Sequence, residues 1–86
     1  MDINELISIV KKKIEKKIEI KNIIIEDKSF LHKNHVGNQQ GKFHLKITLS
    51  SIELKKMGRI NSNKKVYSLI SDEIKKYIHS VQILII

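Results

Sequence analysis

The chain has 86 residues, of which 41% are hydrophobic and 30% charged, and this is enough for one domain, residues 1–86, with a modest core. The absence of cysteine excludes a disulfide framework and a metal site built from thiolates alone, and no apolar run approaches the roughly 20 residues that span a bilayer. The formal charge of +8 suits nucleic acid, anionic lipid or an acidic protein as partner. All basic residues except Arg59 are lysines, which read base edges poorly because they lack the fork of arginine. We expect a cytoplasmic protein that does not bind membranes.

Residues 3–17 are predicted to form an amphipathic helix. Asp2, followed three positions later by Glu5, resembles a capping box at its start. Apolar residues then recur at helical spacing: Ile3, Leu6, Ile7, Val10 and Ile14. The lysines between them are expected to cover the solvent face of this helix.

Two strands are predicted next, separated by a long connection. Glu19 to Glu26 is rich in isoleucine and indicates a largely covered strand, and Asp27 to Gly41 is a polar connection. Lys42 to Ser50 alternates strictly between apolar and polar residues, which is typical of a strand with one buried face. The alternation places His44 opposite the core, where we expect hydrogen bonding or surface exposure.

The remainder predicts a short turn or helix over Ser51 to Gly58, a second long helix and a final strand. Asn61, Ser62 or Asn63 can cap the long helix. Its apolar stripe consists of Val66, Leu69, Ile70, Ile74 and Tyr77, and the strand covers Val81 to Ile86. With both long helices on one face of the sheet, the fold class is α+β, a single two-layer domain in the order helix, strand, strand, short helix, helix, strand.

The four histidines are the candidate metal ligands. His32, His35 and His44 lie within thirteen residues of one another, and His79 stands apart near the C-terminus. Without cysteine, imidazole is the main borderline-soft ligand that the chain offers to a transition metal. The structural alternatives are a helix C-terminal histidine for His79, and for His32 and His35 a solvated loop or an adventitious zinc site.

Four parts of the chain together resemble the BolA family. The first runs from Ile25 to His32 and continues through His35, Gly37 and Gly41. The others are His44 to Ile47, then Val66-Tyr67 with Asp72 to Ile74, and finally Ile78 to Val81. The resemblance implies a fold similar to class II KH domains, although the three glycines of this chain do not form the Gly-x-x-Gly loop with which true KH domains grip RNA.

The resemblance also implies a function. It predicts a protein that is not an enzyme and that partners a monothiol glutaredoxin in iron–sulfur trafficking or iron and redox regulation. The partner would bring its cysteine and a glutathione thiol to a bridging 2Fe–2S cluster, for which imidazoles can replace thiolates. The position of His79 corresponds to the C-terminal ligand and that of His32 to the loop ligand, with His35 as its rival. The resemblance is compatible both with delivery of the cluster to other proteins and with sensing of iron through it.

Two other functions stay in view. A DNA-binding transcriptional regulator, which the resemblance also allows, would use Lys64, Lys65, Lys75 and Lys76 on the long helix. The family usually carries Arg-His-Arg just before that helix, and this chain has Ser62, Asn63 and Lys64 there, which weakens the inference. The other alternative is a homodimer held by the apolar C-terminal strand.

Overall fold

The structure is a computed structural model, and it describes residues 1–29 and 42–86. Most of the predicted connection from Asp27 to Gly41, including His32 and His35, lies outside the described residues. In the part that is described, no helix is long and apolar enough to cross a membrane.

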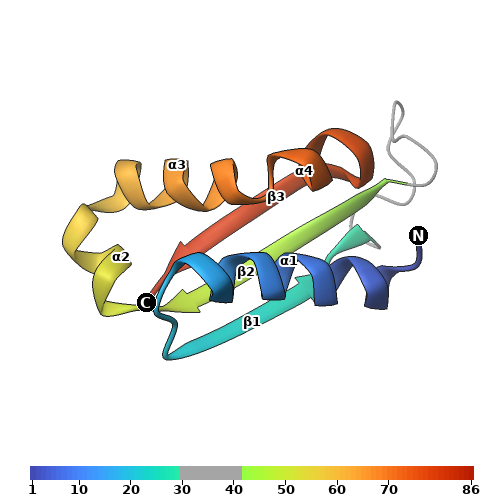
Figure 1. The fold of residues 1–86 in the computed structure, drawn as a ribbon. Helices are drawn as coiled ribbons and strands as arrows, with labels where there is room; N and C mark the ends of the chain where they lie inside the picture. Colours follow the sequence, from blue (N-terminus) through green and yellow to red (C-terminus); the bar gives the residue numbers. More distant parts are fainter. Residues whose placement is uncertain (30–41) are drawn as a thin grey trace.

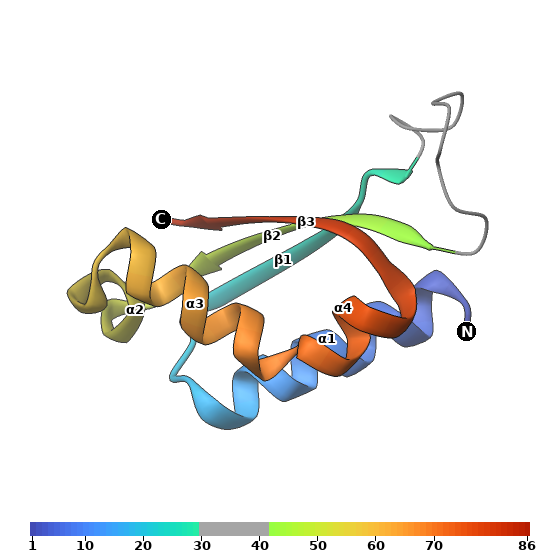
Figure 2. The same ribbon diagram turned by 90° about the horizontal axis from the view of Figure 1, so that it is seen from above.

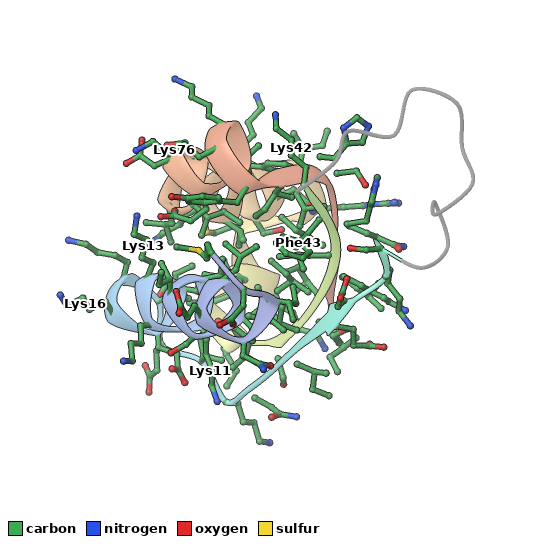
Figure 3. All side chains as sticks on the ribbon, turned by 90° about the vertical axis from the view of Figure 1, so that its right-hand side faces the viewer. Lys11, Lys13, Lys16, Lys42, Phe43 and Lys76 are labelled. Carbon is green, nitrogen blue, oxygen red and sulfur yellow. The ribbon has the colours of Figure 1, made fainter. Side chains whose placement is uncertain are left out.

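The first helix, α1, covers Ile3–Lys17 as predicted. The Asp2 side chain accepts a hydrogen bond from the backbone N–H of Glu5 at 2.9 Å, so the expected cap is present. Leu6, Val10 and Ile14 are buried on one side of the helix. The other side carries the lysines, and Figure 3 shows Lys11 and Lys16 projecting away from the interior.

The sheet has three strands in the order β1 (Asn22–Asp27), β2 (Phe43–Ser50) and β3 (Ile78–Ile85). β1 is antiparallel to β2, and β3 is parallel to β2 (Figure 1). The crossover between the parallel strands contains α2 (Ile52–Met57), α3 (Arg59–Leu69) and α4 (Ser71–Tyr77). Figure 2 shows α1, α3 and α4 on one side of the sheet, so the predicted two-layer α+β fold is confirmed.

The core lies between these two layers. Leu45, Ile47 and Leu49 are at most 3% exposed, which confirms the inward face predicted from the alternation of β2. The helical residues Val10, Ile14 and Ile70 are fully buried against them, and Phe43 and Leu69 are partly buried at the margin of the core. Continuous burial of this kind is what stabilises a domain of this size.

The largest differences between the predicted and observed elements concern β1, β3 and the second long helix. β1 begins at Asn22, later than the predicted Glu19, and β3 begins at Ile78, earlier than the predicted Val81. The predicted second long helix is two helices, because α3 ends before Ile70, whose N–H donates to Tyr67 three residues back, and α4 begins at Ser71.

The predicted cap of the second long helix is wrong. α3 begins at Arg59, directly after Gly58, and has no side-chain cap. The Ser62 and Asn63 side chains lie inside the helix and donate to the backbone carbonyl of Arg59 at 3.0 and 2.8 Å. Gly58, with φ of 82° and ψ of 164°, is the single residue that joins α2 to α3. Because this turn is so short, α3 begins before any of the expected cap residues.

Candidate functional site

His79 lies two residues after the end of α4, at the start of β3. Ile78 is 2% exposed, and its backbone N–H donates to the carbonyl of Glu73, so the end of α4 is held in place. His79 follows as the second residue of β3, with an exposed side chain on extended backbone. It is therefore a strand residue and not a histidine within the last turn of a helix.

His44 lies beside His79 on the neighbouring strand. The two ring centroids are 4.9 Å apart, with 62° between the ring planes. Nδ1 of His44 is 2.6 Å from Oγ of Ser80, and the backbone N–H of His44 donates to Oγ of Ser29 at 3.1 Å. His44 is thus held by two other parts of the chain: β3 contacts its ring, and Ser29 contacts its backbone.

The expectation of hydrogen bonding for His44 is confirmed, and that of surface exposure is wrong, because this residue is only 4% exposed. A register shift between Phe43 and His44 pairs His44 with Ser80 on β3. This pairing places Ser80 and His79 next to the side chain of His44. Strand alternation alone would put that side chain on the open face of the sheet.

The described residues on both sides of 30–41 also lie near this pair of histidines. Asp27 accepts a hydrogen bond from the N–H of Ser29 at 2.9 Å, and the N–H of Lys28 donates to the carbonyl of His44 at 2.7 Å. On the other side, Lys42 directly precedes β2, and its Nζ is 3.5 Å from the carbonyl of Lys75 near the end of α4. The chain therefore leaves and re-enters the described structure close to His79.

A hollow of about 460 Å³ adjoins His44 on the sheet. Polar side chains of Ser80 and Gln82 and the lysines Lys28 and Lys46 line it, together with Leu45 and Val81. Lys28 donates to Glu26 at 2.9 Å, and this hydrogen bond holds the pKa of the Glu26 carboxyl below its usual range. The surroundings of His44 are thus polar and rich in positive charge.

The donor set near His79 fits a shared cluster better than one held by this chain alone. Within residues 1–29 and 42–86, no group of three or more histidine, cysteine or acidic residues is arranged to hold a metal ion. A 2Fe–2S cluster needs four ligands, usually thiolates, and the chain contains no cysteine. His79 offers one exposed imidazole, so the remaining ligands would have to include sulfur from elsewhere.

The four lysines predicted for DNA lie on two helices. Lys64 is exposed on α3, and Lys75 and Lys76 are exposed on α4. Lys65 is half-buried and donates to Glu53 of α2 at 2.8 Å, which holds the pKa of the Glu53 carboxyl below its usual range.

Lysines that the sequence did not indicate share a surface with α4. In Figure 3, Lys13 and Lys16 of α1 project on the same side of the molecule as Lys76. Lys13 also bonds Glu73 of α4 at 2.6 Å, and this hydrogen bond raises the pKa of Lys13. Only the packing of α1 beside α4 brings these lysines together, so no local sequence signal could have found the surface.

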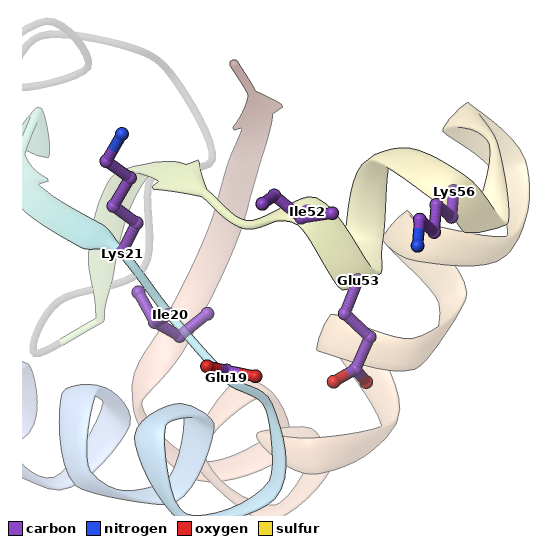
Figure 4. A pocket seen from close by; sticks show the side chains of 6 residues that line it. All are labelled: Glu19, Ile20, Lys21, Ile52, Glu53 and Lys56. Atoms are coloured by element: carbon purple, nitrogen blue, oxygen red, sulfur yellow. The ribbon is translucent and has the colours of Figure 1, made fainter.

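A larger hollow, of about 660 Å³, lies at the opposite end of the sheet (Figure 4). It is lined by Glu19, Ile20, Lys21, Ile52, Glu53 and Lys56, where α1 leads into β1 and α2 begins. Its lining mixes both signs of charge and includes none of the predicted site residues. We therefore place the candidate site at His79.

These features define a small α+β domain that presents a histidine at the start of its last strand. The family model described as BolA-like protein matches residues 14–86, and the chain belongs to the BolA family. It is 26% identical over 73 residues to a protein named DNA-binding transcriptional regulator BolA from Haemophilus influenzae, a match that covers 85% of this chain and 68% of that protein.

Solved structures share the fold. BolA1 from Arabidopsis thaliana superposes with a TM-score of 0.78 at 22% identity, covering 93% of this chain and 88% of that one. The BolA domain of SufE1 from the same plant gives 0.76 at 23% identity, covering 91% and 86%. BolA1 from Mus musculus gives 0.72 at 15% identity, covering 92% and 62%. At these identities the likeness establishes the fold alone.

Proposed function

We propose that this BolA-family protein pairs with a monothiol glutaredoxin and supplies imidazole ligands to a 2Fe–2S cluster that the two proteins share. The observation that carries the proposal is the position of His79, which is exposed and packs against His44. The backbone of His44 in turn contacts Ser29, next to the segment that contains His32 and His35. Because the chain has no cysteine, sulfur ligands would have to come from outside it, and the resemblance to the family implies the cysteine of the partner and a glutathione thiol.

Within this proposal, His79 is the first ligand and His32 the second, with His35 as its rival. A bound cluster of this kind supplies one-electron chemistry and a visible spectrum that depends on its ligands. The contribution of the chain is orientation: the bond between His44 and Ser80 fixes the ring of His44, which packs against His79. A ligand held in this way loses less entropy on binding than one that must first be ordered.

The test is reconstitution of the mixed complex from this protein, the glutaredoxin of its own host, glutathione, iron and sulfide, followed by visible absorption and circular dichroism. We expect His79→Ala to abolish or greatly alter the visible circular dichroism. Gln82→Ala changes an exposed residue of the same strand and should leave the spectrum as it is. An unchanged spectrum for His79→Ala would remove the proposal.

DNA binding is the second candidate function. A relative named as a DNA-binding regulator supports it, as do the exposed lysines Lys64, Lys75 and Lys76. Binding through phosphate contacts must weaken steeply as salt rises, by about 0.9 log units of affinity per log unit of salt for each contact. Changing the three lysines to glutamine should reduce that slope, whereas cluster ligation by His79 should not depend on salt in this way.

The remaining expectations stay predictions: a cytoplasmic location, the absence of enzymatic activity, a homodimer through the last strand and the likeness to class II KH domains. The relative carries the name of a regulator, which agrees with a binding protein.

A further inference from the structure

The outer edge of β3 offers unpaired backbone groups. Successive residues of a strand direct their N–H and C=O groups to opposite sides. The N–H of Ile86 donates to the carbonyl of Leu49 in β2. The backbone N–H and C=O groups of even-numbered residues in β3 therefore point toward β2, and those of odd-numbered residues point away from it. The hydroxyl of Tyr67 donates to the carbonyl of Val81 at 2.9 Å from the outer side, which agrees with this assignment.

The backbone N–H and C=O groups of Ile83 and Ile85 therefore point to the outer edge, beyond the carbonyl of Val81 that Tyr67 covers, while their side chains pack against the core. β3 is an edge strand, and among residues 1–29 and 42–86 no further strand pairs with it. A long, apolar edge with free backbone groups is a template for another strand unless something covers it.

A groove of about 510 Å³ follows this same edge. β3 forms one wall, and the turn from α2 into α3, at Gly58, forms the other. Leu54 and Ser62 at the base are at most 1% exposed. Lys55 and Arg59 are exposed members of the lining, which contains no acidic residue.

We propose that this groove binds an extended acidic peptide segment of a partner protein, which adds a strand to the outer edge of β3. The outward groups of Ile83 and Ile85 supply the main-chain hydrogen bonds, and the groove between strand and helix receives alternate side chains. The charges of Lys55 and Arg59 select for acidic residues in the segment.

A peptide suits the groove better than a nucleic acid. Among the described residues no aromatic side chain lines it, so none of them offers a platform on which bases could stack, whereas the alternating backbone groups match a peptide strand. The groove begins about 10 Å along β3 from His79, at roughly 3.3 Å for each residue from His79 to Gln82. It can be occupied whether or not His79 binds a cluster, and it does not depend on the function proposed above.

The probe is a fluorescein-labelled hexapeptide of alternating glutamate and valine, measured by anisotropy and by amide shifts of the full-length protein labelled with nitrogen-15. We expect shifts at Ile83, Ile85 and Arg59 and none at His79. N-methylation of one alternate set of peptide amides should weaken binding by at least about tenfold, and of the other set by less than about twofold, because only one set faces the strand. Equal effects of the two sets would overturn strand addition.

Variants of the chain test the same contacts. Ile85→Pro removes one outward N–H without touching the β2 ladder and should abolish binding, whereas Ile85→Val should bind as the parent does. Arg59→Glu should weaken binding by about fivefold, and Lys64→Glu, the same charge change outside the groove on the same helix, by less than about twofold.

Three other results would contradict the proposal. The first is unchanged peptide binding in both Arg59→Glu and a folded Ile85→Pro protein. The second is binding of hexathymidylate in the groove, seen as shifts at Ile83 and Ile85, with no binding of the peptide. The third is a dimer that forms through β3, detected by sedimentation, in place of peptide binding.

Discussion

At the scale of single residues, the hydrogen bond between His44 and Ser80 is the contact that fixes the candidate site. Ser80→Ala removes the hydroxyl that lies 2.6 Å from Nδ1 of His44, while the strand remains paired. Because the ring of His44 is buried, we expect a loss of about 1 kcal/mol in the free energy of unfolding, measured with urea. Gln82→Ala, on the same strand, should change that free energy by less than about 0.5 kcal/mol. Equal losses in the two variants would show that the bond contributes nothing.

The sequence indicated His79 but could not predict the surroundings of His44. Ser29 and Ser80 lie 15 and 36 positions away from His44 along the chain, and both are brought to it by the pairing of β2 with β3 and the turn after β1. Strand alternation reports only which side of a sheet a residue faces. Burial of His44 on the open side depends on tertiary contacts, which no local spacing contains.

At the scale of elements, the turn from α2 to α3 rests on the backbone of Gly58. Its φ of 82° and ψ of 164° lie in a region that residues other than glycine rarely adopt, although a Cβ there would meet nothing within 4 Å. Gly58→Ala should therefore cost about 1–3 kcal/mol of unfolding free energy from backbone strain alone. A synthetic chain with D-alanine at this position should retain the parental stability. Equal losses for the two alanines would point to a steric cause instead.

The same two helices are joined by the ion pair between Glu53 and Lys65. The hydrogen bond from Lys65 holds the pKa of Glu53 below its ordinary value of 4.5 in the folded protein. This contribution to stability is therefore present above pH 4.5 and is lost as the pH falls through the lower folded pKa. Glu53→Gln should flatten the fall in urea midpoint below pH 4.5. Glu15→Gln, an exposed change on α1, should leave that fall as steep as in the parent.

Elements with a strong local period could be predicted, and those set by packing could not. The apolar spacing of α1 and the alternation of β2 appear directly in the sequence. The break at Ile70 does not, because no glycine or proline marks it. Ile70 and Ile74 both pack onto the core where α3 ends and α4 begins. The cap was wrong because polar residues suited to capping, Ser62 and Asn63, can also bond within a helix.

At the scale of the whole molecule, the layer order determines where function can lie. Among the described residues, α1, α3 and α4 lie on one side of the sheet, and no strand pairs with the outer edge of β3. The start of β3 carries His79, and its end carries the groove beside Arg59. The two-layer fold could be predicted because the helical period of α1 and the alternation of β2 both indicate one buried interface. The position of His79 and the groove on the same edge strand could not, because it follows only from the parallel crossover between β2 and β3.

The central claim is that His79 binds the iron of a cluster shared with a monothiol glutaredoxin. Pulsed electron paramagnetic resonance of the reduced mixed complex, with this chain labelled at histidine nitrogen, tests it directly. We predict a hyperfine coupling to histidine nitrogen in the parent complex, lost or replaced by a different coupling in His79→Ala and retained in Gln82→Ala. A parent complex without histidine coupling, or an identical coupling in His79→Ala, would contradict the claim.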